Sequence, residues 1–207
     1  MLTVLEAALA LLTWALALGL RPWRMLTGRL ITPWLASVVL LPLVWLVPQR
    51  LPNGLAVQFS GACLLVLMLG WPLAVLALGV VGLLVWLLGQ QGLAEALSQT
   101  VWAGLAPATL ALLLGAALRR WLPPNPFVYV LGRGFLGTAA CVFVAGAAHE
   151  LLYRPVPQVG LEQALVAHWL MAWGDAFLTG MLAAIFVAFA PQWLATWSDS
   201  RYLQTPK

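Results

Sequence analysis

Charged side chains are scarce in this sequence: Asp, Glu, Lys and Arg make up 8% of its 207 residues, while 63% are hydrophobic. Soluble domains contain about 25% charged and about 45–50% apolar residues. A soluble fold of this length has too little interior to hide so much apolar surface, which excludes a cytosolic enzyme. We therefore expect an integral membrane protein. The 12 Trp residues agree, because Trp gathers where a bilayer meets water.

Cysteine is rare as well, and Cys63 and Cys141, both in apolar stretches, provide neither a disulfide framework nor a zinc-binding spacing. A G-x-x-x-x-G-K-S/T phosphate loop is missing, so ATP-driven transport would need a second chain. The net charge of +4 comes from so few residues that it does not predict a nucleic-acid partner. We expect no intrinsic cofactor.

Long apolar runs predict about seven membrane-spanning helices, since one span needs about 20 predominantly apolar residues. Gly70-Trp71-Pro72 divides two of the runs, and we expect a tight helical hairpin there, because one unbroken helix would be far longer than a bilayer is thick. The predicted fold class is all-α, a transmembrane helical bundle. It forms a single membrane domain over 1–207, with spans at about 2–20, 30–48, 55–70, 71–88, 101–118, 127–148 and 168–189, and a short tail at 190–207.

Positive charges define the orientation of the bundle. Loops and tail on one side carry Arg21, Arg24, Arg29, Arg119, Arg120, Arg201 and Lys207. The other side has only Arg50 and Arg154, so the positive-inside rule places the N-terminus outside and the C-terminus in the cytoplasm. The expected location is the bacterial cytoplasmic (inner) membrane. Ala15-Leu16-Ala17 resembles a signal-peptide cleavage site, but Glu6 stands where a basic region would be. We expect an uncleaved first helix.

Polar residues inside the apolar runs are the functional candidates, because an unpaired polar group in a bilayer costs several kcal/mol. Asp175 and Arg133 lie deep in their spans. The others lie near the outer ends of theirs: Glu6, Gln58, His149, Glu150 and His168. This common level suggests a site open to the outside. The alternative is a set of interfacial residues, for which exposure costs little.

The last span carries a polar face. Steps of three and four place Ala164, His168, Met171, Asp175 and Thr179 on one side of a helix. His168 and Asp175 are separated by about 10 Å along the axis, too far to chelate one ion together. Two interpretations remain open: these side chains line a path, or each hydrogen-bonds a neighbouring helix.

Two enzymatic motifs are incomplete. His149-Glu150-Leu151-Leu152-Tyr153 begins like the zinc motif H-E-x-x-H, but Tyr153 replaces the second histidine. Phe59-Ser60-Gly61-Ala62 is similar to an intramembrane serine protease turn, yet G-x-S-x-G and a partnered base are missing. We expect that the protein is not an enzyme.

Three stretches carry a family resemblance: Gly54–Ala62 with Leu69–Pro72, Leu122–Tyr129, and Trp173–Met181 with Pro191–Trp197. They resemble the membrane-embedded substrate-capture subunits of cobalt and nickel energy-coupling-factor transporters. The resemblance implies seven spans with an outside N-terminus and uptake of a transition metal cation as substrate. Implied partners are membrane lipid, a transmembrane coupling subunit and cytoplasmic ATPases.

The chain departs from the metal-binding members of that family at two histidine positions, which are Leu2 and Gln58 here. Neither side chain suits nickel or cobalt. His149 and His168 are the alternative metal ligands, with Glu150 and with Glu6 or Gln58, if their helices converge.

Small residues offer candidate surfaces for a partner helix: Ala15 with Gly19, and Gly132 with Gly134. The expected function is the permease or substrate-capture subunit of an energy-coupling-factor importer. The alternative is an accessory or assembly subunit that keeps the fold but has lost metal transport.

Overall fold

The computed structural model describes residues 2–26, 28–47, 58–153 and 160–202. Helices form all of its regular structure in these ranges, and no strand occurs there. In chain order the elements are α1 (Leu2–Gly19), η1 (Pro22–Arg24), α2 (Gly28–Leu46), α3 (Ala62–Leu69), α4 (Trp71–Leu88), α5 (Leu93–Gln99), η2 (Thr100–Leu105), α6 (Ala106–Trp121), η3 (Val128–Leu136), α7 (Gly137–Tyr153), α8 (Leu161–Phe189), η4 (Pro191–Trp193) and α9 (Asp199–Tyr202). η2 and η3 are π-helical turns that run directly into α6 and α7.

Five helical stretches of the described chain are long and apolar enough to cross a bilayer: Gly28–Leu46, Trp71–Leu88, Leu93–Trp121, Val128–Tyr153 and Leu161–Phe189. The helix Thr3–Gly19 is apolar but shorter. Large apolar side chains remain exposed along α1, α2 and α8, as on a surface that contacts lipid. The expectation of an all-helical, multi-pass membrane protein is confirmed at this level.

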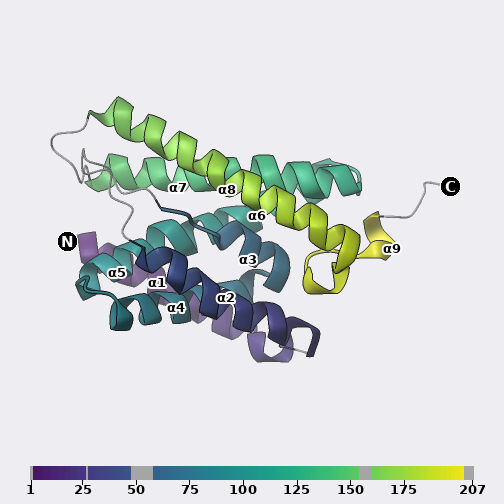
Figure 1. Ribbon diagram of the computed structural model, residues 1–207, viewed down its shortest axis with the longest axis horizontal. Helices are drawn as coiled ribbons and strands as arrows, with labels where there is room; N and C mark the ends of the chain where they lie inside the picture. Colours follow the sequence, from purple (N-terminus) through teal and green to yellow (C-terminus); the bar gives the residue numbers. More distant parts are fainter. Residues whose placement is uncertain (1, 27, 48–57, 154–159, 203–207) are drawn as a thin grey trace.

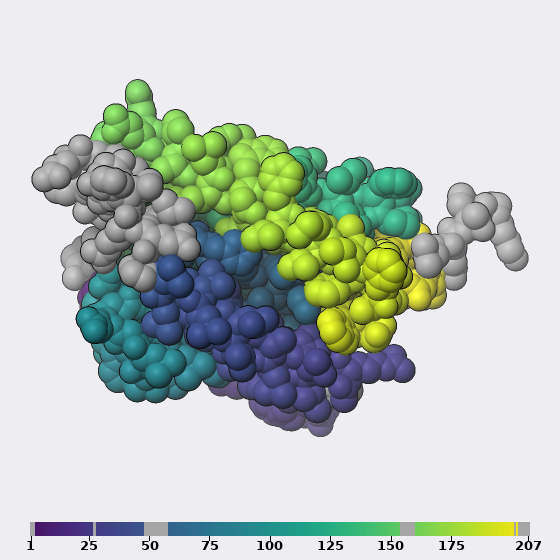
Figure 2. All heavy atoms as spheres, viewed as in Figure 1, coloured from purple at the N-terminus to yellow at the C-terminus, as the bar shows by residue number. Residues whose placement is uncertain are grey.

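The helices pack around α4. Half of α4 is buried, including Val75, Leu78 and Val81, and it contacts α1, α2, α3 and α6. α7 and α8 lie side by side as an antiparallel pair along one edge of the bundle (Figure 1). The short helix α3 lies between α2 and this pair, and the space-filling view shows it recessed between α2 and α8 (Figure 2).

The third predicted span differs from a simple helix. Of the run 55–70, residues 55–57 lie outside the described chain, Gln58–Gly61 is non-helical, and α3 has eight residues. Eight residues rise about 12 Å, too little to cross a bilayer alone. Gly61 (φ 68°) and Gly70 (φ 75°) bracket α3 with backbone conformations that glycine adopts at least cost. The expected break at Gly70 is therefore present, and a second break precedes it.

Three other helices are longer than the hydropathy predicts. Helix begins at Leu93 rather than near 101, α7 continues to Tyr153, and α8 begins at Leu161 rather than 168. Polar residues such as Glu95 and Glu162 occupy these extra turns. Hydropathy underestimates such helices because their ends extend beyond the apolar stretch.

Candidate functional site

A buried carboxylate holds the N-terminal end of α3. Asp175 of α8 is 1% exposed; its Oδ2 accepts a hydrogen bond from the Ser60 backbone N–H and its Oδ1 accepts one from the Gly61 N–H, both at 3.0 Å. The first N–H groups of a helix have no partner within the helix, and its dipole attracts negative charge there. Asp175 thus stabilises a helix start in the interior of the bundle.

A proline explains the second attachment of this helix start. Pro107 has no N–H, so the backbone C=O of Ala103, four residues earlier, lacks its usual helical donor. The Ser60 hydroxyl donates to that oxygen at 2.6 Å and also accepts from the Ala62 N–H at 3.2 Å. Ser60 is a structural hydrogen-bonding residue in this arrangement.

The C-terminal end of α3 is held by the segment after α8. The backbone N–H of Ala195 donates to the Met68 C=O at 2.9 Å, and the Thr196 hydroxyl donates to the Leu67 C=O at 2.9 Å. The Tyr129 hydroxyl lies 2.8 Å from the Thr196 hydroxyl. Both ends of α3 are therefore bound to parts of one C-terminal stretch, which includes α8 and the residues that follow it.

A cluster of polar and aromatic side chains occupies the opposite end of the bundle from this C-terminal segment. Glu6 of α1 is 1% exposed, and its Oε1 accepts from the Trp102 indole N–H at 3.0 Å. The His149 ring lies 5.7 Å from the Trp102 ring and stacks on Tyr153 with centroids 4.9 Å apart. Among the described residues, no Lys or Arg forms an ion pair with Glu6.

Glu150 and His168 form a pair beside this cluster. Glu150 Oε1 lies 3.0 Å from His168 Nε2, across the α7–α8 contact. Gly146 makes room for the imidazole, because a Cβ there would lie 2.5 Å from His168 Nδ1. The pair is partly buried, with Glu150 7% exposed. We name Glu6, Trp102, His149, Glu150 and His168 the outer polar cluster, after the side of the membrane on which the sequence predicts it.

The two histidines do not share one ligand sphere. Consecutive helical residues point about 100° apart, so His149 faces Trp102 while Glu150 faces His168. In the described part of the chain, no three His, Cys, Asp or Glu side chains are arranged as ligands of one metal ion. The candidate ligands therefore lie at one level of the bundle, but of the two histidines it is His168 that pairs with Glu150.

The polar face of α8 points inward, as its periodicity predicts. Asp175 and Thr179 are buried, and Met171 Sδ accepts a hydrogen bond from the Gln58 backbone N–H at 3.3 Å. The Gln58 amide nitrogen and the Thr179 hydroxyl are buried without a partner in the described chain. Asp175 binds α3, which favours the helix-packing interpretation for that position.

The candidate docking residues separate into two kinds. Gly134 is buried against α8 of the same chain, where a Cβ would lie 3.2 Å from the Ala183 Cβ. Its small size thus serves an internal helix crossing rather than a partner. Gly132 is half-buried near Leu118, whereas Ala15 and Gly19 are exposed on α1 and remain available for a partner helix.

Sequence reasoning missed two partners of the outer polar cluster. Nothing in the local sequence distinguishes Trp102 from the other tryptophans before α1 brings Glu6 to its indole. Tyr153 stands in the sequence where a zinc motif would have its second histidine, and it stacks on His149 one helical turn away. The i, i+4 spacing of these two residues is the signal that predicts their contact. Both cysteines are buried and free, as expected.

Comparisons with protein-family models, with curated proteins and with solved structures find no match to this chain.

Proposed function

We propose that this chain is the permease or substrate-capture subunit of an energy-coupling-factor importer, with a transition metal cation as its substrate. The observation that carries the proposal is the outer polar cluster, in which two buried carboxylates and two imidazoles lie at one end of an apolar helical bundle. Ionisable groups at membrane depth are costly and mark ion pathways more often than packing. A coupling subunit and cytoplasmic ATPases would supply the energy.

The break in the third span also supports transport. An extended Gln58–Gly61 followed by α3 would span about 25 Å, close to the hydrocarbon thickness. If this run and α1 also cross the bilayer, they would add two crossings to the five long helices. Non-helical backbone at this depth is tolerated only where protein or a cavity surrounds it, and broken helices of this kind are frequent in transporters.

The arginines support an inside C-terminus in the bacterial inner membrane. η1 with Arg24 contacts α4, and Met25 lies beside Gly70 at the start of that helix. Thr196, Tyr202 and Arg119 lie at this same end of the bundle. Since positive charge marks the cytoplasmic side, the outer polar cluster faces outward and can receive a substrate from outside.

Metal content of the purified protein tests the proposal. After incubation with cobalt, nickel, copper and zinc, the wild type should retain one equivalent of a metal by mass spectrometry. His149→Ala/His168→Ala and Glu6→Gln should lose it. Glu162→Gln is the matched control, because Glu162 is an exposed carboxylate at the start of α8. Equal metal content in all variants contradicts the proposed site.

The alternative, an accessory subunit without transport, is favoured by one observation: Glu150 and His168 already satisfy each other, and no third ligand joins them in the described chain. This alternative predicts that the chain co-purifies with a partner and stabilises it equally well in the wild type and in His149→Ala/His168→Ala. The capture proposal fails if the chain binds neither a metal nor a coupling subunit.

A further inference from the structure

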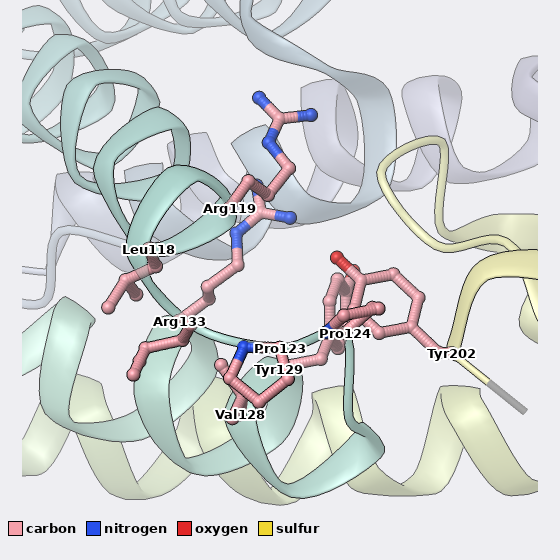
Figure 3. Close-up of a pocket in the computed structure, with 9 residues that line it drawn as sticks. Leu118, Arg119, Pro123, Pro124, Val128, Tyr129, Arg133 and Tyr202 are labelled. Atoms are coloured by element: carbon pink, nitrogen blue, oxygen red, sulfur yellow. The ribbon is translucent and has the colours of Figure 1, made fainter. Parts of the chain in front are cut away.

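A cavity lies at the arginine-rich end of the bundle, and no residue of the outer polar cluster lines it. It has a volume of about 200 Å³ and lies between the end of α6, the loop that follows it, the start of η3 and α9. Its lining includes Arg119, Arg133, Pro123, Val128 and Tyr202 (Figure 3).

Arg133 is a buried cation without a counter-charge among the described residues. It is 8% exposed, and its Nη1 is buried without a hydrogen-bond partner in the described chain. All six acidic residues of the protein lie in the described ranges, and none of them forms an ion pair with Arg133. Its guanidinium lies 5.3 Å from the centre of the Tyr129 ring. A buried charge is costly unless it is paired, so an anion bound in this cavity would stabilise Arg133.

The structure keeps the guanidinium in place through small and aromatic neighbours. A Cβ at Gly115 would lie 2.7 Å from Arg133 Nη2, so a larger residue would take space that the guanidinium uses. The backbone C=O of Gly115 accepts a hydrogen bond from Arg119 Nε at 3.1 Å, which places the second arginine at the same cavity. Tyr202 packs on the Tyr129 and Trp197 rings, and Figure 3 shows its hydroxyl turned toward the cavity.

Two arginines and a hydroxyl in a small cavity match a phosphate group. The guanidinium is planar and donates pairs of hydrogen bonds to phosphate oxygens, which gives both charge and geometric complementarity. A carboxylate is smaller, and it has fewer oxygens to accept paired hydrogen bonds from two guanidinium groups. The cavity is too small for a nucleotide-sized ligand, since sites for drug-sized molecules measure about 300–1,000 Å³.

The surroundings indicate that the phosphate belongs to a lipid. Trp121 and Phe127, next to the cavity lining in sequence, are 77% and 73% exposed. Exposed aromatic side chains at the end of a membrane helix mark the interface between bilayer and water. Basic pockets between membrane helices on the cytoplasmic side bind anionic head groups.

We propose that the cavity formed by Arg119, Arg133 and Tyr202 binds the phosphate group of an anionic phospholipid. The proposal does not depend on transport or on the outer polar cluster. The lipid phosphate supplies the anion that Arg133 lacks, and the acyl chains lie along the exposed apolar surface beside Trp121 and Phe127.

Native mass spectrometry with phosphatidylglycerol and with phosphatidylcholine of the same acyl chains tests the proposal. The wild type should bind one phosphatidylglycerol, with phosphatidylcholine at least about tenfold weaker because its choline cation repels the arginines. Arg119→Gln and Arg133→Gln should each weaken phosphatidylglycerol binding at least about tenfold. Arg120→Gln is the matched control, because this neighbouring arginine does not line the cavity, and it should bind as the wild type does.

Several outcomes overturn the proposal. Unchanged phosphatidylglycerol affinity in Arg119→Gln and Arg133→Gln refutes the site, and an equal loss in Arg120→Gln reduces it to a general charge effect. If inorganic phosphate at millimolar concentration displaces the lipid, the phosphate group bound in the cavity need not come from a lipid, and the proposal is wrong. If Arg133→Gln does not fold, Arg119→Gln still tests the site, because Arg119 is exposed. Arg133→Lys keeps the charge but loses the planar guanidinium with its paired donors, so it should bind the lipid more weakly than the wild type does.

Discussion

The attachment of α3 to α8 through Asp175 leads to a quantitative prediction. In Asp175→Asn, one side-chain oxygen still accepts from one backbone N–H, while the amide NH₂ group faces the other N–H. Losing one hydrogen bond to a charged acceptor costs about 1.5–3 kcal/mol. Asp175→Ala removes both acceptors and should cost about twice as much. Since a whole domain is stable by about 5–15 kcal/mol, Asp175→Asn is the variant expected to remain folded.

Hydrogen exchange at the Ser60 and Gly61 amides measures this effect directly. A loss of about 1.5–3 kcal/mol corresponds to roughly 10- to 150-fold faster exchange if these amides open locally. Asp199→Asn is a suitable control: its carboxylate accepts from the Trp197 indole N–H at 2.6 Å and contacts neither amide. Exchange at Ser60 and Gly61 that is the same in the wild type and in Asp175→Asn would refute the assigned role of this carboxylate.

Three further substitutions have expected outcomes, the first two measured by thermal unfolding in detergent and the third by metal content. Gly61→Ala should destabilise the protein by about 1–2 kcal/mol, because φ is 68° and the new Cβ would lie 2.9 Å from Leu41. Gly174→Ala is the control, since this glycine has open space around it, and it should be neutral or stabilising. Equal melting temperatures of the two variants would refute the strain at Gly61. Thr179→Val should be neutral or stabilise by about 1 kcal/mol, since the buried hydroxyl has no partner in the described chain, and a clear loss would reveal a bond that the geometry lacks. Gly146→Ala should displace the His168 ring, so that it mimics His168→Ala in metal content; a variant with wild-type content would contradict this.

Periodicity predicted the inward face of α8 correctly, because a helix that packs on one side must place every third or fourth residue there. The all-helical, multi-pass character also follows from hydropathy, although five of the seven expected spans are helices long enough to cross a bilayer in the described chain. The break before α3 could not be predicted this way. Its stability depends on a carboxylate 114 and 115 residues away and on a carbonyl released by Pro107, and neither leaves a signal in the local sequence.

The proposed metal site shows another limit of sequence reasoning. Placing His149, Glu150 and His168 at one end of the bundle needs only their distance from the helix ends. Whether they converge depends on how α7 is rotated about its own axis, and a rotation of about 100° exchanges His149 for Glu150 at the α8 contact. Packing determines that rotation. Gly134 of η3 packs against Ala183, and Gly146 of α7 packs against His168, so that the continuous helix η3–α7 approaches α8 closely on the face that carries Glu150.

The two attachments of α3 have a mechanical consequence. Asp175 binds the start of α3 and Thr196 binds its end, and both belong to the chain from α8 onward. A shift of α8 relative to α4 would therefore carry α3 with it, unless hydrogen bonds at both ends broke together. Gly70, at φ 75°, is the residue between α3 and α4 that can absorb such a shift, because its conformation costs glycine little and any other residue more. His168 lies two turns before Asp175 on the same face of α8, so a ligand that displaced His168 from Glu150 would act on the helix that holds α3.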